Sequence, residues 1–170
     1  FSGCGLGMDE PTLEELRRMR GVASYQFDGN VGEMLFPDGV KITRSKSTGR
    51  IRHIYYKGRM LATLRPKDGL IALTLTGASR ILRCVLAKRI IVVADDEAVD
   101  FVKRGRSLFA RHVYNADLEL KAGEEVIITD KNGRLIAVGK AALNGEEMMR
   151  FKYGVAVKIR RSLGEGVRKG

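Results

Sequence analysis

The chain has 170 residues, of which 44% are hydrophobic, and a formal net charge of +11. Its length allows one domain or two small ones of about 80 residues each, and excludes a (β/α)₈ barrel, which needs about 250 residues. No apolar run approaches the ~20 residues of a membrane-spanning helix, so no membrane partner is expected, and the positive charge favours an anionic partner.

The first half of the chain predicts a helix, then a small sheet, then a second helix. Thr12 and Glu15 have the spacing of a capping box, so a helix is expected to begin at Thr12, and Gly21 is expected to end it. Turn residues punctuate the chain that follows, which indicates a meander of strands. The strands are expected at about residues 40–45, 50–56, 59–64 and 70–75. Thr76 then caps a helix that runs to about Ala87.

The second half of the chain is expected to be mostly strand. Asp95 caps a short helix that ends at Arg104 and Gly105, and Asn144, with Glu147 three residues on, caps another. The strands are expected at about residues 90–94, 113–116, 125–130, 134–143 and 155–161. Short strands around one or two brief helices favour a small closed or half-open barrel.

These patterns divide the chain into two domains and a tail. The expected division is a small α+β domain at residues 1–88, a β pseudobarrel at 89–161 and a basic C-terminal tail at 162–170. The fold class is therefore α+β. The two cysteines, Cys4 and Cys84, are too far apart in the sequence to indicate a disulfide framework, so a reducing cytoplasmic location is expected.

A basic segment stands out between Asp38 and Asp68, where 29 residues contain no acidic side chain and nine Lys or Arg. Strand alternation sets Val40 and Ile42 against Lys41, and Ile51, His53 and Tyr55 against Arg50 and Arg52, so the basic side chains are expected to share one face of a β-ribbon. A solvated sheet face is the alternative, but such faces normally mix both signs of charge. We call this segment the basic ribbon. Its charge favours contact with a nucleic acid, and the residues expected to make that contact are Arg44, Lys46, Arg50, Arg52, Arg65 and Lys67.

Residues 89–161 resemble a PUA domain, the RNA-binding module named for pseudouridine synthases and archaeosine transglycosylases. The segments that carry the resemblance are 101–110 (FVKRGRSLFA), 122–126 (AGEEV), 137–140 (AVGK) and 153–158 (YGVAVK). Most PUA domains have Pro-Gly-Val where this chain has Arg111, His112 and Val113. The transglycosylase branch instead has Phe-Ala-Lys/Arg-x-Val, as here.

The front of the chain resembles the domain that precedes PUA in archaeosine tRNA-guanine transglycosylases. The segments that carry this resemblance are 23–27 (ASYQF), 35–40 (LFPDGV), 45–52 (SKSTGRIR) and 61–69 (LATLRPKDG). Together the resemblance covers about residues 20–161. The family's catalytic barrel and structural zinc do not fit upstream of residue 20, so the resemblance implies a stand-alone relative of the RNA-binding tail, which assists a separate catalytic tRNA-modifying subunit.

The resemblance also implies where RNA lies on the PUA domain. The loop after the helix and the strand around Gly139 would hold a single-stranded RNA end between them, with Gly105 letting the backbone approach closely. Plain turn geometry is the alternative explanation of the glycines. The residues implied in this groove are Arg104, Gly105, Arg106, Ser107, Arg111, Val138, Gly139 and Lys140.

Catalytic and metal-binding patterns are not expected. Cys4, Cys84, His53 and His112 have no metal-ligand spacing, and both histidines are interpreted as surface or partly buried residues. The acidic doublets at 95–96 and 146–147 fall at expected helix starts, where capping explains them, and the doublet at 124–125 is interpreted as solvated. No catalytic residue, metal site or cofactor is therefore predicted.

These observations predict a protein that binds tRNA at its acceptor stem and 3′ end as a non-catalytic accessory to tRNA modification. The alternative is a translation-associated PUA protein that acts on ribosome-bound tRNA. An enzyme would instead need three or more polar side chains that converge in a cleft. A structural ribosomal protein would have a long basic tail, of which only Arg168 and Lys169 give a hint.

Overall fold

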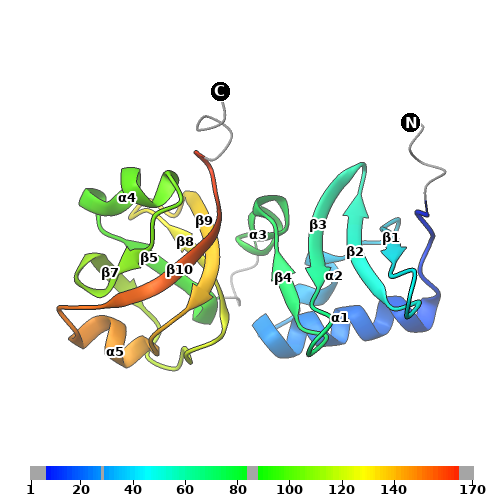
Figure 1. Ribbon diagram of the computed structural model, residues 1–170, viewed down its shortest axis with the longest axis horizontal. Coiled ribbons are helices and arrows are strands. Elements are labelled where there is room, and N and C mark those ends of the chain that lie inside the picture. Colours follow the sequence, from blue (N-terminus) through cyan, green and yellow to red (C-terminus); the bar gives the residue numbers. More distant parts are fainter. Residues whose placement is uncertain (1–6, 28, 84–87, 165–170) are drawn as a thin grey trace. The chain divides into compact units, whose positions relative to one another are not determined.

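The computed structural model describes residues 7–27, 29–83 and 88–164 (Figure 1). The chain divides into two compact units, residues 1–86 and 87–170, and each unit has its own sheet. Cys4, Cys84 and residues 165–170 of the expected tail lie outside the described residues. Within the described ranges, no helix is both long and apolar enough to cross a membrane.

A four-stranded antiparallel sheet and the helices α1, α2 and α3 form the described part of the first unit. The sheet is a meander in the order β1-β2-β3-β4, so successive turns lie alternately at its two ends. The elements are α1 (Leu13–Phe27), α2 (Val31–Leu35), β1 (Lys41–Arg44), β2 (Ile51–Tyr56), β3 (Arg59–Leu64), β4 (Ile71–Leu73) and α3 (Leu75–Ile81). The four predicted strands are confirmed.

The helices of this unit cover one face of its sheet. A row of buried residues crosses the four strands: Ile42, Ile54, Ala62 and Leu73. The neighbouring row points to the opposite face and is only half-buried: Thr43, His53, Thr63 and Ala72. The core therefore lies between the helices and the first row.

The first helix does not end at Gly21, as the sequence predicted, but continues to Phe27. A glycine inside a helix costs only about 1 kcal/mol relative to alanine, and burial beyond Gly21 outweighs that cost. Ala23 and Phe27, one and two turns past Met19, are fully buried.

The predicted cap of α3 is also wrong by two residues, because Thr74, not Thr76, accepts a hydrogen bond from Gly77 N–H at 3.1 Å.

At each edge of this sheet, a single residue hydrogen-bonds to the backbone of the edge strand. At the β1 edge, the backbones of Asp9 and Ile42 exchange two hydrogen bonds of 2.8 Å. At the β4 edge, the buried side chain of Gln26 does the same with the backbone of Ile71: its amide donates to the carbonyl and its oxygen accepts from the N–H, both at 2.8 Å. Gln26 thus acts as a one-residue strand.

A six-stranded sheet in the order β6-β10-β9-β8-β5-β7 forms the second unit. The β5–β8 pair is parallel and the other pairs are antiparallel, which gives a nearly closed β pseudobarrel. The helices and strands are β5 (Ile91–Ala94), α4 (Asp96–Lys103), β6 (Leu108–Phe109), β7 (Val113–Ala116), β8 (Glu125–Thr129), β9 (Leu135–Ala141), α5 (Gly145–Arg150) and β10 (Val155–Ser162). Aliphatic side chains fill its interior. The predicted α+β class and pseudobarrel are confirmed.

The predicted helix caps of this unit are confirmed. Asp95 caps α4, and Asn144 and Glu147 form a reciprocal capping box at the start of α5. The prediction that the doublet at 124–125 is solvated is wrong. Glu125 is buried and pairs with Arg160 across the sheet, while Glu124 accepts from Arg89 at 2.7 Å.

Candidate nucleic-acid interface

Two hairpin turns of the first unit share one backbone geometry. In the β1–β2 turn, Ser45 N–H donates to Arg50 O and Gly49 N–H donates to Ser45 O, both at 2.8 Å. In the β3–β4 turn, residues 65–70 repeat both bonds at the same distances. Gly49 and Gly69 each have a φ of +72°, which favours glycine. Because the sheet is a meander, both turns lie at the same end of it (Figure 1).

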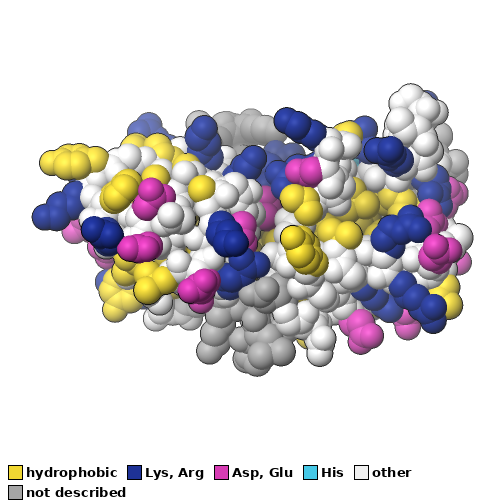
Figure 2. Space-filling view, turned by 90° about the horizontal axis from the view of Figure 1, so that it is seen from below, with side chains coloured by type: hydrophobic (Ala, Val, Ile, Leu, Met, Phe, Trp, Pro, Cys, Tyr) yellow, Lys and Arg dark blue, Asp and Glu magenta, His cyan; other side chains and the backbone are white. Residues whose placement is uncertain are grey.

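A pocket of about 670 Å³ is lined by α1 and by these two turns. Figure 2 views the molecule from the side on which both turns lie in Figure 1, and on this unit it shows hydrophobic side chains beside Lys and Arg. The apolar lining is Met19, Val22, Ile51, Leu64 and Pro66. The charged lining is Arg18, Arg44, Arg50, Arg52, Arg65, Glu15 and Asp68. Five arginines and two acids give the lining a net charge of +3.

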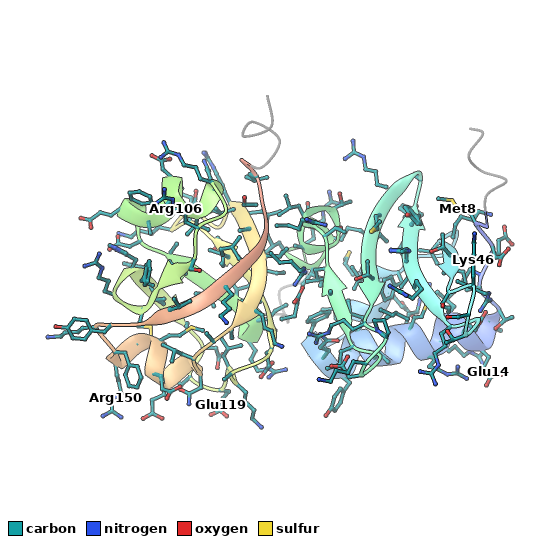
Figure 3. All side chains as sticks on the ribbon, in the orientation of Figure 1. Met8, Glu14, Lys46, Arg106, Glu119 and Arg150 are labelled. Carbon is teal, nitrogen blue, oxygen red and sulfur yellow. The ribbon has the colours of Figure 1, made fainter. Side chains whose placement is uncertain are left out.

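The structure brings together four of the six residues predicted on the basic ribbon. Those that line the pocket are Arg44, Arg50, Arg52 and Arg65. Lys46 and Lys67 are exposed on the two turns, Lys46 being labelled in Figure 3. The pocket itself could not be found from the sequence, because the residues of α1 that line it, Glu15 to Val22, lie more than twenty positions before Arg44.

Arg44 is held by Glu15 of α1. The two terminal nitrogens of its guanidinium donate to the two carboxylate oxygens at 2.7 and 2.8 Å. The hydrogen bond from Arg44, with that from the Thr12 N–H, lowers the pKa of Glu15 from 4.5 to about 2. Arg44 therefore fixes the hairpin to α1, and its charge is already balanced.

The alternation predicted that all basic side chains of the ribbon share one face, and this is wrong: Lys41 and Arg44, which alternate with Ile42 and Thr43, lie on opposite faces of β1. Ile54 of β2, not Tyr55, is fully buried, while His53 faces the opposite side and bonds Thr43 Oγ1 at 2.9 Å. A bulge shifts the register of β1 and β2, so that Thr43 pairs with His53 but Arg44 pairs with Ile51. Arg52 is the residue left unpaired by this shift, and it lines the pocket with Arg44. A bulge re-aims side chains in this way.

The pocket arginines differ in how they are paired. Arg65 lies 3.5 Å from Asp68 through Nε, which is buried and has no hydrogen-bond acceptor among the described residues. Arg50 and Arg52 make no ion pair within residues 7–27, 29–83 and 88–164. These two arginines are therefore available to an anionic ligand.

In the second unit, Gly105 ends α4. Its N–H donates to Val102 O at 2.9 Å and the next N–H, of Arg106, donates to Phe101 O at 3.1 Å, the pattern of a Schellman motif. Its φ is +88°, so the turn requires glycine. Arg104 and Arg106 are exposed beside it, and Figure 3 shows Arg106 at this end of the unit.

The other half of the groove that the resemblance implied lies on β9. Val138 and Gly139 are buried in β9, which has β8 on one side and β10 on the other. A Cβ on Gly139 would lie 2.2 Å from Lys158 O, so the packing of β9 against β10 requires glycine here. Lys140 is exposed on the same strand, as are Arg106 and Arg111 elsewhere in the unit.

A second surface of this unit was not anticipated. A pocket of about 240 Å³ is lined by Phe109, Arg111, Lys152, Tyr153 and Gly154. Tyr153 is 86% exposed and Phe109 is 45% exposed. Aromatic and basic side chains together suit stacking of bases and contact with phosphates. Basic and aromatic residues alternate at positions 150–153 (RFKY), which is a sequence signal for such a surface. The sequence alone could not show that these aromatic residues are exposed.

Metal-ligand clusters of three or more His, Cys, Asp or Glu are not found in the part of the chain that the structure describes. His53 is partly buried against Thr43, and His112 is half-buried. The interpretation of both histidines as partly buried residues is confirmed.

Two family models match the chain. Residues 17–88 match the patch-forming domain C2 of tRNA-guanine transglycosylase, and residues 90–163 match the PUA domain. The chain is 40% identical over 156 residues to the tRNA-guanine(15) transglycosylase of Methanothermobacter thermautotrophicus, covering 92% of this chain and 24% of that protein. It is also 40% identical over 157 residues to the tRNA-guanine(15) transglycosylase of Thermococcus kodakarensis, and the alignment covers 92% of this chain and 27% of that protein. The chain thus spans about a quarter of the length of these curated relatives.

A solved structure shares the fold. A conserved PUA domain protein from Thermoplasma acidophilum superposes with a TM-score of 0.68 at 20% identity, covering 96% of this chain and 98% of that one. The two family matches fall on the two units, and the relatives align with both units at once. The chain belongs to the tRNA-guanine transglycosylase family, of which it represents the C-terminal region, a C2 domain followed by a PUA domain.

Proposed function

We propose that this chain binds tRNA and holds its acceptor stem and 3′ end for a tRNA-modifying catalytic site. That site can lie on another part of a longer chain or on a separate subunit. The relatives are named as tRNA-guanine(15) transglycosylases, which makes tRNA the polyanion that fits the charge of +11. The chain would then contribute affinity and orientation.

The observation that carries this proposal is the unbalanced charge of the pocket in the first unit. Arg44 is neutralised by Glu15, whereas Arg50 and Arg52 line the same pocket with no carboxylate partner in the described part of the chain. Two exposed lysines, Lys46 and Lys67, extend the charge along the turns. An RNA phosphate backbone requires such unpaired cations, since displaced counterions drive binding.

The second unit supports binding of the 3′ end. Arg104 and Arg106 flank a helix end that Gly105 keeps in a fixed turn, so backbone and guanidinium groups are presented together. Single-stranded RNA ends are read by such groups, because their bases are free to be splayed out. On β9, the exposed Lys140 adds a cation next to Gly139.

The test compares intact tRNA with tRNA that lacks its single-stranded 3′ terminus, for the wild type, Arg106→Glu and Arg150→Glu. Arg106 and Arg150 lie at opposite ends of the second unit (Figure 3), and both substitutions reverse an exposed charge. We expect truncation of the tRNA to weaken binding by the wild type severalfold. Arg106→Glu should bind both tRNAs with the affinity that the wild type has for the truncated tRNA. Equal binding of both RNAs by the wild type would refute end recognition. No binding of either RNA would refute the proposed function.

A further inference from the structure

The pocket of the first unit has a feature that phosphate binding alone does not require, namely an apolar part of its lining. We call these apolar residues the floor, and the arginines and turns that complete the lining the rim. We propose that this pocket takes one unpaired nucleotide of the bound RNA, with its base against the floor and the adjoining phosphates on Arg50 and Arg52. This inference rests on the proposed function and deepens it. It specifies an unstacked nucleotide, not a paired helix, as the ligand of this unit.

The floor comes from three elements. Met19 and Val22 belong to α1, Ile51 begins β2 and Leu64 ends β3. Val22, Ile51 and Leu64 are only half-buried, so part of their surface is exposed to the pocket. A nucleobase has two apolar faces, and burying one of them against these side chains removes apolar surface from water on both partners.

The size of the pocket agrees with this ligand. Its volume of about 670 Å³ is within the ~300–1,000 Å³ of small-molecule sites, which are also mostly apolar with a few polar groups. A base in a duplex is stacked on both faces, so only an unpaired nucleotide can enter such a pocket. The paired backbone of a helix would contact the rim and leave the floor empty.

The rim supplies the charges that the phosphates of such a nucleotide need. Arg50 follows the β1–β2 turn and Arg52 stands in the adjacent bulge, so they reach the pocket from neighbouring positions of one strand. Arg65, on the other turn, has a buried Nε that lacks an acceptor in the part of the chain that the structure describes. A ligand oxygen near it would satisfy that donor, which costs free energy while it is unpaired.

The geometry of the rim is fixed before any ligand binds. The two turns are closed by identical hydrogen bonds, and Arg44 anchors the first of them to α1 through Glu15. Thr48 Oγ1 accepts from the Arg50 N–H at 3.2 Å, which orients the backbone beside that arginine. A preorganised site loses less entropy on binding than a mobile one.

The experiment uses the full chain and two RNA hairpins that differ by one nucleotide. The first is fully paired, and the second has a single unpaired 2-aminopurine nucleotide inserted in the same stem. Val22→Phe fills the floor with an apolar ring and leaves every charge in place. Leu13→Phe adds the same ring on the exposed face of α1, outside the pocket, as the matched control. Leu64→Phe is a second floor variant in case Val22→Phe does not fold, which thermal melting will show.

We expect the wild type and Leu13→Phe to bind the hairpin with the unpaired nucleotide severalfold more tightly and to change its 2-aminopurine fluorescence. A folded floor variant should lose this preference and the fluorescence change, yet bind the paired hairpin as the wild type does. The preference for the unpaired nucleotide should persist in Arg106→Glu, because the site of this preference is in the first unit and Arg106 is in the second. Equal binding of the two hairpins by the wild type, or a preference that survives a filled floor, would overturn this inference while leaving RNA binding intact. Failure to bind either hairpin would refute the proposed function itself.

Discussion

Arg44 and Glu15 join the hairpin of the first unit to its longest helix through two parallel hydrogen bonds of 2.7 and 2.8 Å. The same carboxylate accepts from the Thr12 N–H at 3.0 Å and so also caps α1. One acidic residue thus fixes both the start of the helix and the position of the basic turn. Arg44 is a structural residue among the basic residues of the pocket, and substitutions there test folding more than RNA contact.

The stability of the first unit should depend on pH through Glu15. Because its pKa is lowered to about 2 in the folded chain, its contribution is fully present above its ordinary pKa of 4.5 and is lost as the pH falls toward 2. The pair is partly exposed, so we expect Glu15→Gln to cost on the order of 1–2 kcal/mol at pH 7 and nothing below pH 2. Urea unfolding from pH 7 to pH 2 measures this. Glu14→Gln, whose carboxylate is exposed, should follow the wild-type curve.

Reversing Arg50 and Arg52 to Glu should weaken RNA binding without unfolding the chain. Each phosphate contact that is lost should reduce the slope of log K against log salt by about 0.7 for a single strand and 0.9 for a duplex. Affinity measured over a range of salt concentrations gives this slope. Arg17→Glu, an exposed charge on α1 outside the pocket, should leave the slope nearly unchanged. An unaltered slope in the double variant would show that the pocket is only a solvated surface.

Gly139→Ala should destabilise the second unit instead of removing an RNA contact. Its Cβ would lie 2.2 Å from Lys158 O, a backbone atom that can move only if β9 and β10 separate. We expect a loss of about 1–3 kcal/mol or more in the free energy of unfolding, as for other overpacked positions. Lys140→Ala, next to it and exposed, should stay within about 0.5 kcal/mol. Equal stability of the two variants would contradict the close packing of these strands.

Arg160→Met should destabilise the second unit strongly, because it leaves the carboxylate of Glu125 buried without its guanidinium. The expected cost is about 3–5 kcal/mol. Adding Glu125→Gln should recover part of this loss, since the buried charge is then removed. Arg161→Met changes the adjacent exposed arginine and should have little effect. Denaturant unfolding of the wild type and these three variants is the test, and a small effect of Arg160→Met would mean that water reaches Glu125.

Local signals predicted the elements of this fold well where neighbouring residues decide the structure. The caps at Asp95 and Asn144 and the glycines of the two turns act within a few residues, and all were predicted from the sequence. Gly21 was misread because the burial of Phe27, not local propensity, keeps α1 helical there.

The sites were less predictable, because each depends on residues distant in the sequence. The alternation of β2 was assigned to the wrong face, since a bulge at Arg52 shifts its register. Glu125 was taken as solvated because its partner, Arg160, is 35 residues away. The basic character of the ribbon could be read from composition, but which arginines are free depends on the carboxylates that the fold brings to them.

The single-residue pairings at the two edges of the first sheet should limit edge-to-edge association when many copies bind one polyanion. An open sheet edge offers a row of unpaired N–H and C=O groups to any extended chain nearby. Asp9 occupies such groups on β1, and Gln26 occupies them on β4. A strand from another molecule would have to displace one of these contacts before it could extend the sheet. Crowding along RNA should therefore not lead this unit into fibrous aggregates.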